Sequence, residues 1–113
     1  MKKYFFILAL FLAACKPEMP QVPSDVLTPQ QMREVMVDIH IADALAQTKA
    51  QAGGNEQQLT ESYYKVVFKK FNITEDQFRR SYKYYESHPA WMNRIYDGVM
   101  TDLSKKEAEE SKQ

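Results

Sequence analysis

Residues 28–51 read TPQQMREVMVDIHIADALAQTKAQ, and this stretch predicts the helix around which the fold is organised. Thr28 suits the N-cap position, Pro29 suits the first helical position and Gln31 the third, which is the pattern of a capping box. The glycine pair at 53–54 follows the stretch and is typical of a helix end. The whole stretch is therefore expected to form one helix.

Apolar residues recur at helical spacing on two sides of this predicted helix. The main stripe, expected to face the core, consists of Met32, Val35, Met36, Ile39, Ala42 and Ala46. A second strip, on roughly the opposite side, consists of Val37, Ile41, Ala44 and Leu45. A helix that is apolar on two sides is usually packed by more than one neighbour, so we expect it to be central.

Three further helices are expected after the glycine pair, at about 57–71, 75–87 and 89–103. Thr74 begins the second of these as an N-cap, and His88-Pro89 separates the last two because a residue before proline avoids helical geometry. Gly98 lies inside the last helix and indicates a close approach to a neighbouring helix. The charged residues from Ser104 onward are expected to fray.

The beginning of the chain predicts a lipoprotein signal. Lys2 and Lys3 precede an apolar run that ends in Leu12-Ala13-Ala14-Cys15, a lipobox that contains the only cysteine. The run is shorter than the roughly 20 residues that a membrane span needs. We expect cleavage after residue 14 and a diacylglycerol thioether at Cys15; an ordinary secretory signal with a chance cysteine is the alternative.

The residues after Cys15 indicate where the anchored protein resides and how it is spaced from the bilayer. Lys16, in place of an aspartate, favours the outer membrane, and the lack of a run of acids favours the periplasmic side. Prolines recur from 16 to 27 and favour an extended spacer, which would reach roughly 37 Å. Residues 21–25 of this spacer are expected to pack on nothing. The expected division is a signal peptide over 1–14, a lipid anchor and tether over 15–27, a helical domain over 28–104 and a charged tail over 105–113.

Charge argues against a nucleic-acid partner. The chain has 15 basic and 15 acidic residues, and loss of Lys2 and Lys3 with the signal peptide leaves 13 against 15, a formal charge of −2. Nucleic-acid binders depend on an excess of basic residues, so no nucleic-acid partner is expected for this protein. With 2 histidines and one cysteine, which lipidation would consume, zinc is poorly supported and no cofactor is expected.

A candidate polar site lies on the first helix. His40 and Asp43 are three residues apart and can be neighbours, and Asp43 falls within the main apolar stripe. A functional site for a metal or a ligand would be completed by Ser81, Tyr84 or His88. In the structural alternative, which we favour, Asp43 is satisfied by His40, a tyrosine hydroxyl or an arginine. No serine or cysteine nucleophile with a spaced base is visible, so no catalytic residue is assigned.

A candidate interaction surface follows, in which aromatic and basic residues alternate: Arg79, Arg80, Lys83, Tyr84 and Trp91. Tyrosine, tryptophan and arginine are enriched at interface hot spots, so a protein contact or a glycan platform is expected if these side chains are exposed. Phe78, Tyr82, Tyr85 and Tyr96 are instead expected in the core. Lys65, Lys69 and Lys70 form a basic edge that is either a solvated face or a contact for anionic headgroups or an acidic partner.

Three segments together resemble a known family. They are residues 36–44 (MVDIHIADA), residues 63–78 from Tyr63-Tyr64 to Phe78, and residues 81–97 with Ser81-Tyr82-Lys83-Tyr84-Tyr85 and Ile95-Tyr96-Asp97. The family is the small lipoproteins of Bacteroidota grouped as domain of unknown function 4296. His88 stands where asparagine is commoner in that family. The resemblance implies a helical, lipid-anchored envelope protein and carries no established activity.

The sequence thus predicts an all-α protein, a small bundle of about four helices on a lipidated N-terminal tether. The expected role is a non-enzymatic module that binds another envelope protein. The alternative is a small-ligand site, for a glycan or metabolite, or a weakly catalytic site around His40 and Asp43.

Overall fold

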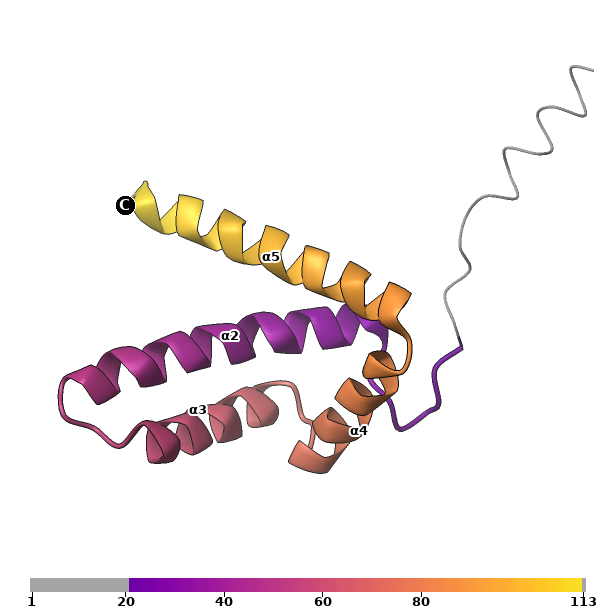
Figure 1. The fold of residues 1–113 in the computed structure, drawn as a ribbon, viewed down its shortest axis with the longest axis horizontal. Helices are drawn as coiled ribbons and strands as arrows, with labels where there is room; N and C mark the ends of the chain where they lie inside the picture. The colour runs from indigo at the N-terminus through magenta and orange to yellow at the C-terminus, as the bar shows by residue number, and fades with distance from the viewer. Residues whose placement is uncertain (1–20, 113) are drawn as a thin grey trace, which may run out of the picture.

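The computed structural model describes residues 21–112, and four helices pack together in this part of the chain (Figure 1). They are α2 (Pro29–Gln51), α3 (Glu56–Lys70), α4 (Glu75–Glu86) and α5 (Pro89–Ser111). The all-helical prediction is confirmed. The predicted signal peptide, lipobox and Cys15 lie outside the described residues.

Short polar residues set the helix starts as predicted. At α2 the Thr28 hydroxyl accepts from the Gln31 backbone N–H at 3.2 Å, and the Gln31 side chain accepts from the Thr28 N–H at 3.0 Å. This reciprocal pair is a capping box, and it satisfies two backbone donors that a helix start leaves free. Asn55 and Thr74 cap α3 and α4 through their side-chain oxygens.

The central position of α2 is also confirmed. Helix α3 runs antiparallel to α2 on one side, and α5 runs parallel to α2 on the other (Figure 1). The short helix α4 lies across the end of the bundle at which α2 and α5 begin (Figure 1). From that end α5 diverges from α2, so the two helices separate toward the C-terminus of α5 (Figure 1).

The main stripe of α2 forms the middle of the core. All six of its residues are buried, and they join buried residues of the other helices: Val67, Phe68, Tyr85, Met92, Ile95 and Val99. The second strip is only partly correct. Val37 is buried and Ile41 half-buried, but Ala44 and Leu45 are exposed. Flanking helices cover the two sides of α2 and leave the sector that contains Leu45 open to solvent.

The segment just before α2 belongs to the fold, contrary to the prediction that residues 16–27 are a spacer outside it. Val26 and Leu27 are 9% and 3% exposed. The Leu27 N–H donates to the Ser81 hydroxyl at 2.9 Å, and the Tyr85 hydroxyl donates to the Leu27 carbonyl at 2.6 Å. Asp25 pairs with Arg80 at 3.0 Å. The proline pattern predicts extended backbone but carries no information about these side-chain partners on α4.

The charged C-terminal residues also differ from the prediction. Helix α5 continues through them to Ser111. Because α5 is already nucleated at Pro89, each added residue extends the helix without a new nucleation cost. The predicted close approach at Gly98 is confirmed, since a Cβ there would lie 2.7 Å from the Arg33 side chain.

Candidate functional site

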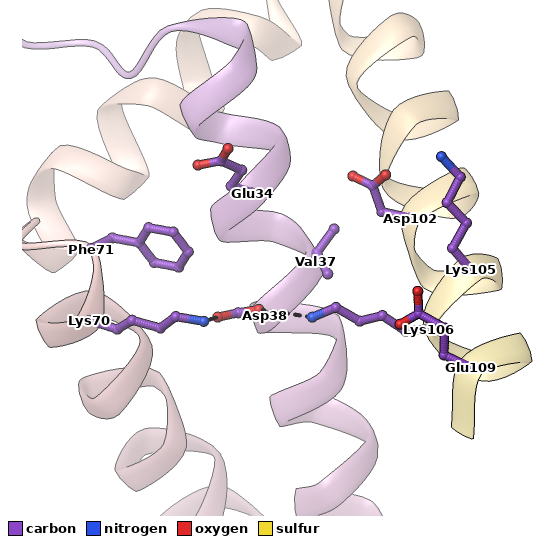
Figure 2. Close-up of a pocket in the computed structure, with 9 residues that line it drawn as sticks. All are labelled: Glu34, Val37, Asp38, Lys70, Phe71, Asp102, Lys105, Lys106 and Glu109. Carbon is purple, nitrogen blue, oxygen red and sulfur yellow. Dashed lines mark hydrogen bonds and ion pairs between the residues drawn. The ribbon is translucent and has the colours of Figure 1, made fainter. Parts of the chain in front are cut away.

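A charged cleft lies where α5 diverges from α2. It has a volume of about 420 Å³ and lies between α2, α5 and the C-terminal end of α3 (Figure 2). Its lining includes the apolar side chains of Val37 and Phe71. The other lining residues are charged: Glu34, Asp38, Lys70, Asp102, Lys105, Lys106 and Glu109. No motif in the sequence predicts this cleft.

Asp38 connects the three helices at this cleft. Its carboxylate lies 2.6 Å from Lys70 Nζ of α3 and 3.8 Å from Lys106 Nζ of α5 (Figure 2). The Asp38 side chain is only 15% exposed, whereas the two lysines are about half-exposed or more. Exposed ion pairs contribute little each, roughly 0–1 kcal/mol. The bridge therefore orients the helices more than it stabilises them.

A second ion pair joins α2 and α5 beside the cleft. The Arg33 guanidinium donates to both carboxylate oxygens of Asp102, at 2.7 and 2.6 Å. These hydrogen bonds raise the pKa of Arg33 and hold the pKa of Asp102 below its usual value. Gly98 leaves room for the Arg33 side chain to lie across α5. This bidentate geometry fixes the register of α2 and α5 at the end where the two helices are still in contact.

The lining of the cleft combines charged and apolar side chains. Positively charged lysines and negatively charged carboxylates line the cleft together with the apolar side chains of Val37 and Phe71. Such a lining can hold a small molecule that has both an apolar body and charged groups.

A smaller, mainly apolar hollow of about 220 Å³ lies between α2 and α3, and it shares Asp38 with the cleft. Ile41 and Leu45 of α2 line it together with Tyr63 and Val66 of α3. Leu45 is 47% exposed and Val66 is 66% exposed. We call Ile41, Leu45 and Val66 the open face. Leu45 belongs to the second apolar strip predicted from the sequence, but its exposure was not predicted.

The predicted polar site is divided among separate contacts. Asp43 is half-buried and accepts a hydrogen bond from the Tyr64 hydroxyl at 2.5 Å. Burial and this hydrogen bond raise the pKa of Tyr64. His40 packs edge-on against Tyr96, with ring centroids 6.5 Å apart. Ser81 is fully buried and bonds to the segment before α2, so its hydroxyl joins neither His40 nor Asp43.

Tyr64 is thus the partner of Asp43, in agreement with the structural alternative, which included a tyrosine hydroxyl. The sequence signal for this pair is present but weak. Tyr64 lies on the apolar side of α3, and the two helices run antiparallel through a short turn. Several tyrosines satisfy the same description, so the choice among them needs the packed structure.

The predicted aromatic and basic surface is largely engaged in contacts within the domain. Tyr84 is half-buried and stacks on His88, with ring centroids 4.4 Å apart. Trp91 is half-buried against the core, and Arg94 lies 5.0 Å from its ring. Two of the exposed basic side chains are paired, Arg79 with Glu75 and Arg80 with Asp25, and Lys83 is exposed on the same helix.

Two further findings apply to residues 21–112. In this part of the chain, no group of three or more histidine, cysteine or carboxylate side chains is arranged to hold a metal ion. None of α2 to α5 combines the length and apolar character needed to cross a membrane.

Comparison with known proteins gives a family and no activity. No curated protein and no solved structure matches the chain. The family model described as Domain of unknown function (DUF4296) matches residues 23–109. The match begins within the segment that α4 holds and extends into the charged part of α5. The chain therefore belongs to the DUF4296 family, as the sequence resemblance predicted.

Proposed function

We propose that this protein is a lipid-anchored envelope protein whose helical domain binds another protein through the open face. The observation that carries the proposal is the exposure of Leu45 and Val66, at 47% and 66%, in one hollow between α2 and α3. Scattered exposed apolar residues are ordinary, but two that share a hollow form a patch that a partner can cover. Burial of such side chains on binding is the main favourable contribution to association.

The other polar groups of interest support binding over catalysis, because each already serves packing. Asp43 accepts from Tyr64, and Ser81 holds Leu27. A catalytic residue needs a partner that activates it and space for a substrate beside it. Ser81 is fully buried and has no such space.

The proposed location rests on the lipobox at 12–15 and on Lys16. We place the diacylglycerol at Cys15 and the domain on the periplasmic side of the outer membrane. Cys15→Ser should yield either soluble periplasmic protein or an uncut precursor, because the thioether that anchors the chain cannot form. Membrane fractionation with metabolic labelling by a fatty acid measures this. A processed Cys15→Ser chain that stays in the membrane fraction would refute the anchor.

Partner binding can be tested with a photo-crosslinking amino acid in intact cells. At position 45 it should give a discrete protein adduct. Met100 is a matched control, since it is apolar and 56% exposed but lines another part of the surface on α5. Equal labelling at 45 and 100, or no adduct at 45, would refute the open face as the binding surface.

Binding of a small ligand is the second candidate function. The cleft between α2 and α5 suits a ligand better than the surroundings of His40 and Asp43 do. Figure 2 shows the Phe71 ring and Lys70 on the α3 side of the cleft, Val37 on α2 and Lys105 on α5. A glycan fragment or metabolite with a carboxylate would match this lining. Native mass spectrometry of protein from its own envelope tests the idea. A bound small molecule that is lost in Lys105→Gln, together with no adduct at position 45, would favour this candidate.

A further inference from the structure

We infer that the protein bound by the open face is a second copy of this chain, paired antiparallel about a two-fold axis near Ile41 and Val66. This inference rests on the proposed function and names its partner. In such an isologous pair the same patch on both copies forms the interface, so the patch must be complementary to itself. Its apolar centre and the charges at its two ends meet that requirement.

Ile41 and Val66 of the open face lie at one level across α2 and α3, and Leu45 follows about one turn later on α2. Two contacts fix this register: Tyr64 bonds Asp43, and Lys70 bonds Asp38. Val66 lies between the two α3 positions, and Ile41 lies between the two α2 positions. An axis at that level brings Ile41 and Val66 of one copy onto the same residues of the other.

The charges along α2 differ between the two ends of the open face. Glu34 and Asp38 precede Ile41, whereas Lys49 follows it. Glu34 is seven residues before Ile41 and Lys49 is eight after it, so they lie roughly 10–12 Å from the axis on opposite sides at 1.5 Å per residue. An antiparallel pair therefore sets Glu34 of each copy near Lys49 of the other.

These two side chains are available for such a contact. Both are exposed, and neither forms an ion pair with another residue in the described range 21–112. Glu34 accepts only a hydrogen bond from Gln30, and Lys49 lies 5.5 Å from the Tyr63 ring. The net charge of the chain is also close to zero, so two copies do not repel one another at long range.

The strength of the pair follows from its size. The exposed apolar part comprises two side chains per copy, well short of a standard interface of roughly 800 Å² per partner. A weak dimer is expected in dilute solution. Copies anchored in one membrane have a much higher effective concentration, which favours the pair without new contacts.

Disulfide crosslinking of the full-length protein in its own membranes tests the inference. Val66→Cys places a thiol beside the axis, and mild oxidation should give a covalent dimer several-fold more abundant than from the control Met100→Cys. Both positions are exposed, so neither change disturbs the core. Leu45→Asp added to Val66→Cys should lower the dimer yield to that of the Met100→Cys control. Dimer yields from Val66→Cys and Met100→Cys that do not differ would overturn the inference.

Charge exchange tests the antiparallel register in the Val66→Cys background. Glu34→Lys and Lys49→Glu should each lower the dimer yield several-fold, because each sets like charges opposite one another, and the double variant should restore it. Failure of the double variant to restore the yield would overturn the antiparallel pair.

The same crosslinking experiments distinguish failure of this inference from failure of the proposed function. A Val66→Cys crosslink to a different protein would overturn the second copy as partner and leave the open face as a binding surface. Dimers from the parent chain alone would mean a free Cys15 thiol, which overturns the lipid anchor. The Val66→Cys and Met100→Cys comparison then decides the dimer in a Cys15→Ser background.

Discussion

Tyr85→Phe tests whether the segment before α2 is held by α4. Tyr85 is fully buried, and its hydroxyl donates to the Leu27 carbonyl at 2.6 Å. Phenylalanine keeps the ring and its packing but removes the donor. The Leu27 residue is itself 3% exposed, so water cannot readily replace the lost hydrogen bond.

The expected loss of stability in Tyr85→Phe comes from the Leu27 carbonyl, which is left buried without a hydrogen-bond donor. A buried polar group that loses its partner costs about 1–3 kcal/mol. For a domain of 60–100 residues, each kcal/mol lowers the melting temperature by roughly 4–8 °C. Tyr85→Phe should therefore melt at least several degrees below the parent, with an unchanged slope in urea because the surface exposed on unfolding is the same.

Ser81→Ala acts on the other side of the same residue. It removes the acceptor of the Leu27 N–H, which lies 2.9 Å from the Ser81 hydroxyl. A similar cost of about 1–3 kcal/mol is expected. The double variant should cost less than the two separate losses added together, because once one bond is lost the segment can leave α4 and hydrate both groups.

Urea and thermal unfolding of the mature chain, followed by far-ultraviolet circular dichroism, measure these free energies. Tyr82→Phe is the matched control. Its hydroxyl bonds the Tyr96 hydroxyl at 3.1 Å on a half-buried site, so its removal should cost less. A Tyr85→Phe protein within about 0.5 kcal/mol of the parent would refute the claim that this segment is part of the fold.

Two further predictions concern the hydroxyl groups of Tyr64 and Tyr85. Asp43→Asn should lower the free energy of unfolding by about 1 kcal/mol, because a neutral oxygen replaces the charged acceptor of the Tyr64 hydroxyl; unchanged urea unfolding would contradict this. Burial raises the pKa of Tyr85 from 10.0 to about 12, so between those pH values the unfolded chain releases a phenolic proton that the folded chain retains. Stability should then fall as pH rises, by about 2–3 kcal/mol at pH 12, and titrated unfolding of Tyr85→Phe should lack this part of the loss.

The local features of the fold could be read from the sequence because local chemistry decides them. A Thr-Pro-Gln-Gln start satisfies free backbone donors within one turn, and apolar residues spaced by three and four must share one side of a helix. The start of α2, its buried stripe and the close approach at Gly98 depend on these rules. All three agree with the structure.

Partners from distant parts of the chain could not be read in this way. The proline pattern before α2 is compatible with a free spacer, and only the placement of α4 brings Ser81 and Tyr85 to Leu27. Likewise Asp43 has a tyrosine partner because α3 folds back along α2, and nothing in the spacing alone selects Tyr64.

The sequence by itself determined the helical class, the helix starts and the central role of α2, because these depend on neighbours within a few residues. Only the tertiary structure decided which apolar residues stay exposed. Leu45 and Val66 have the spacing of core residues, but α3 and α5 flank α2 without closing over it. The cleft at Asp38 has the same origin, since it exists only because α5 diverges from α2. Angles between helices come from side-chain packing over the whole domain, and no short stretch of sequence encodes them.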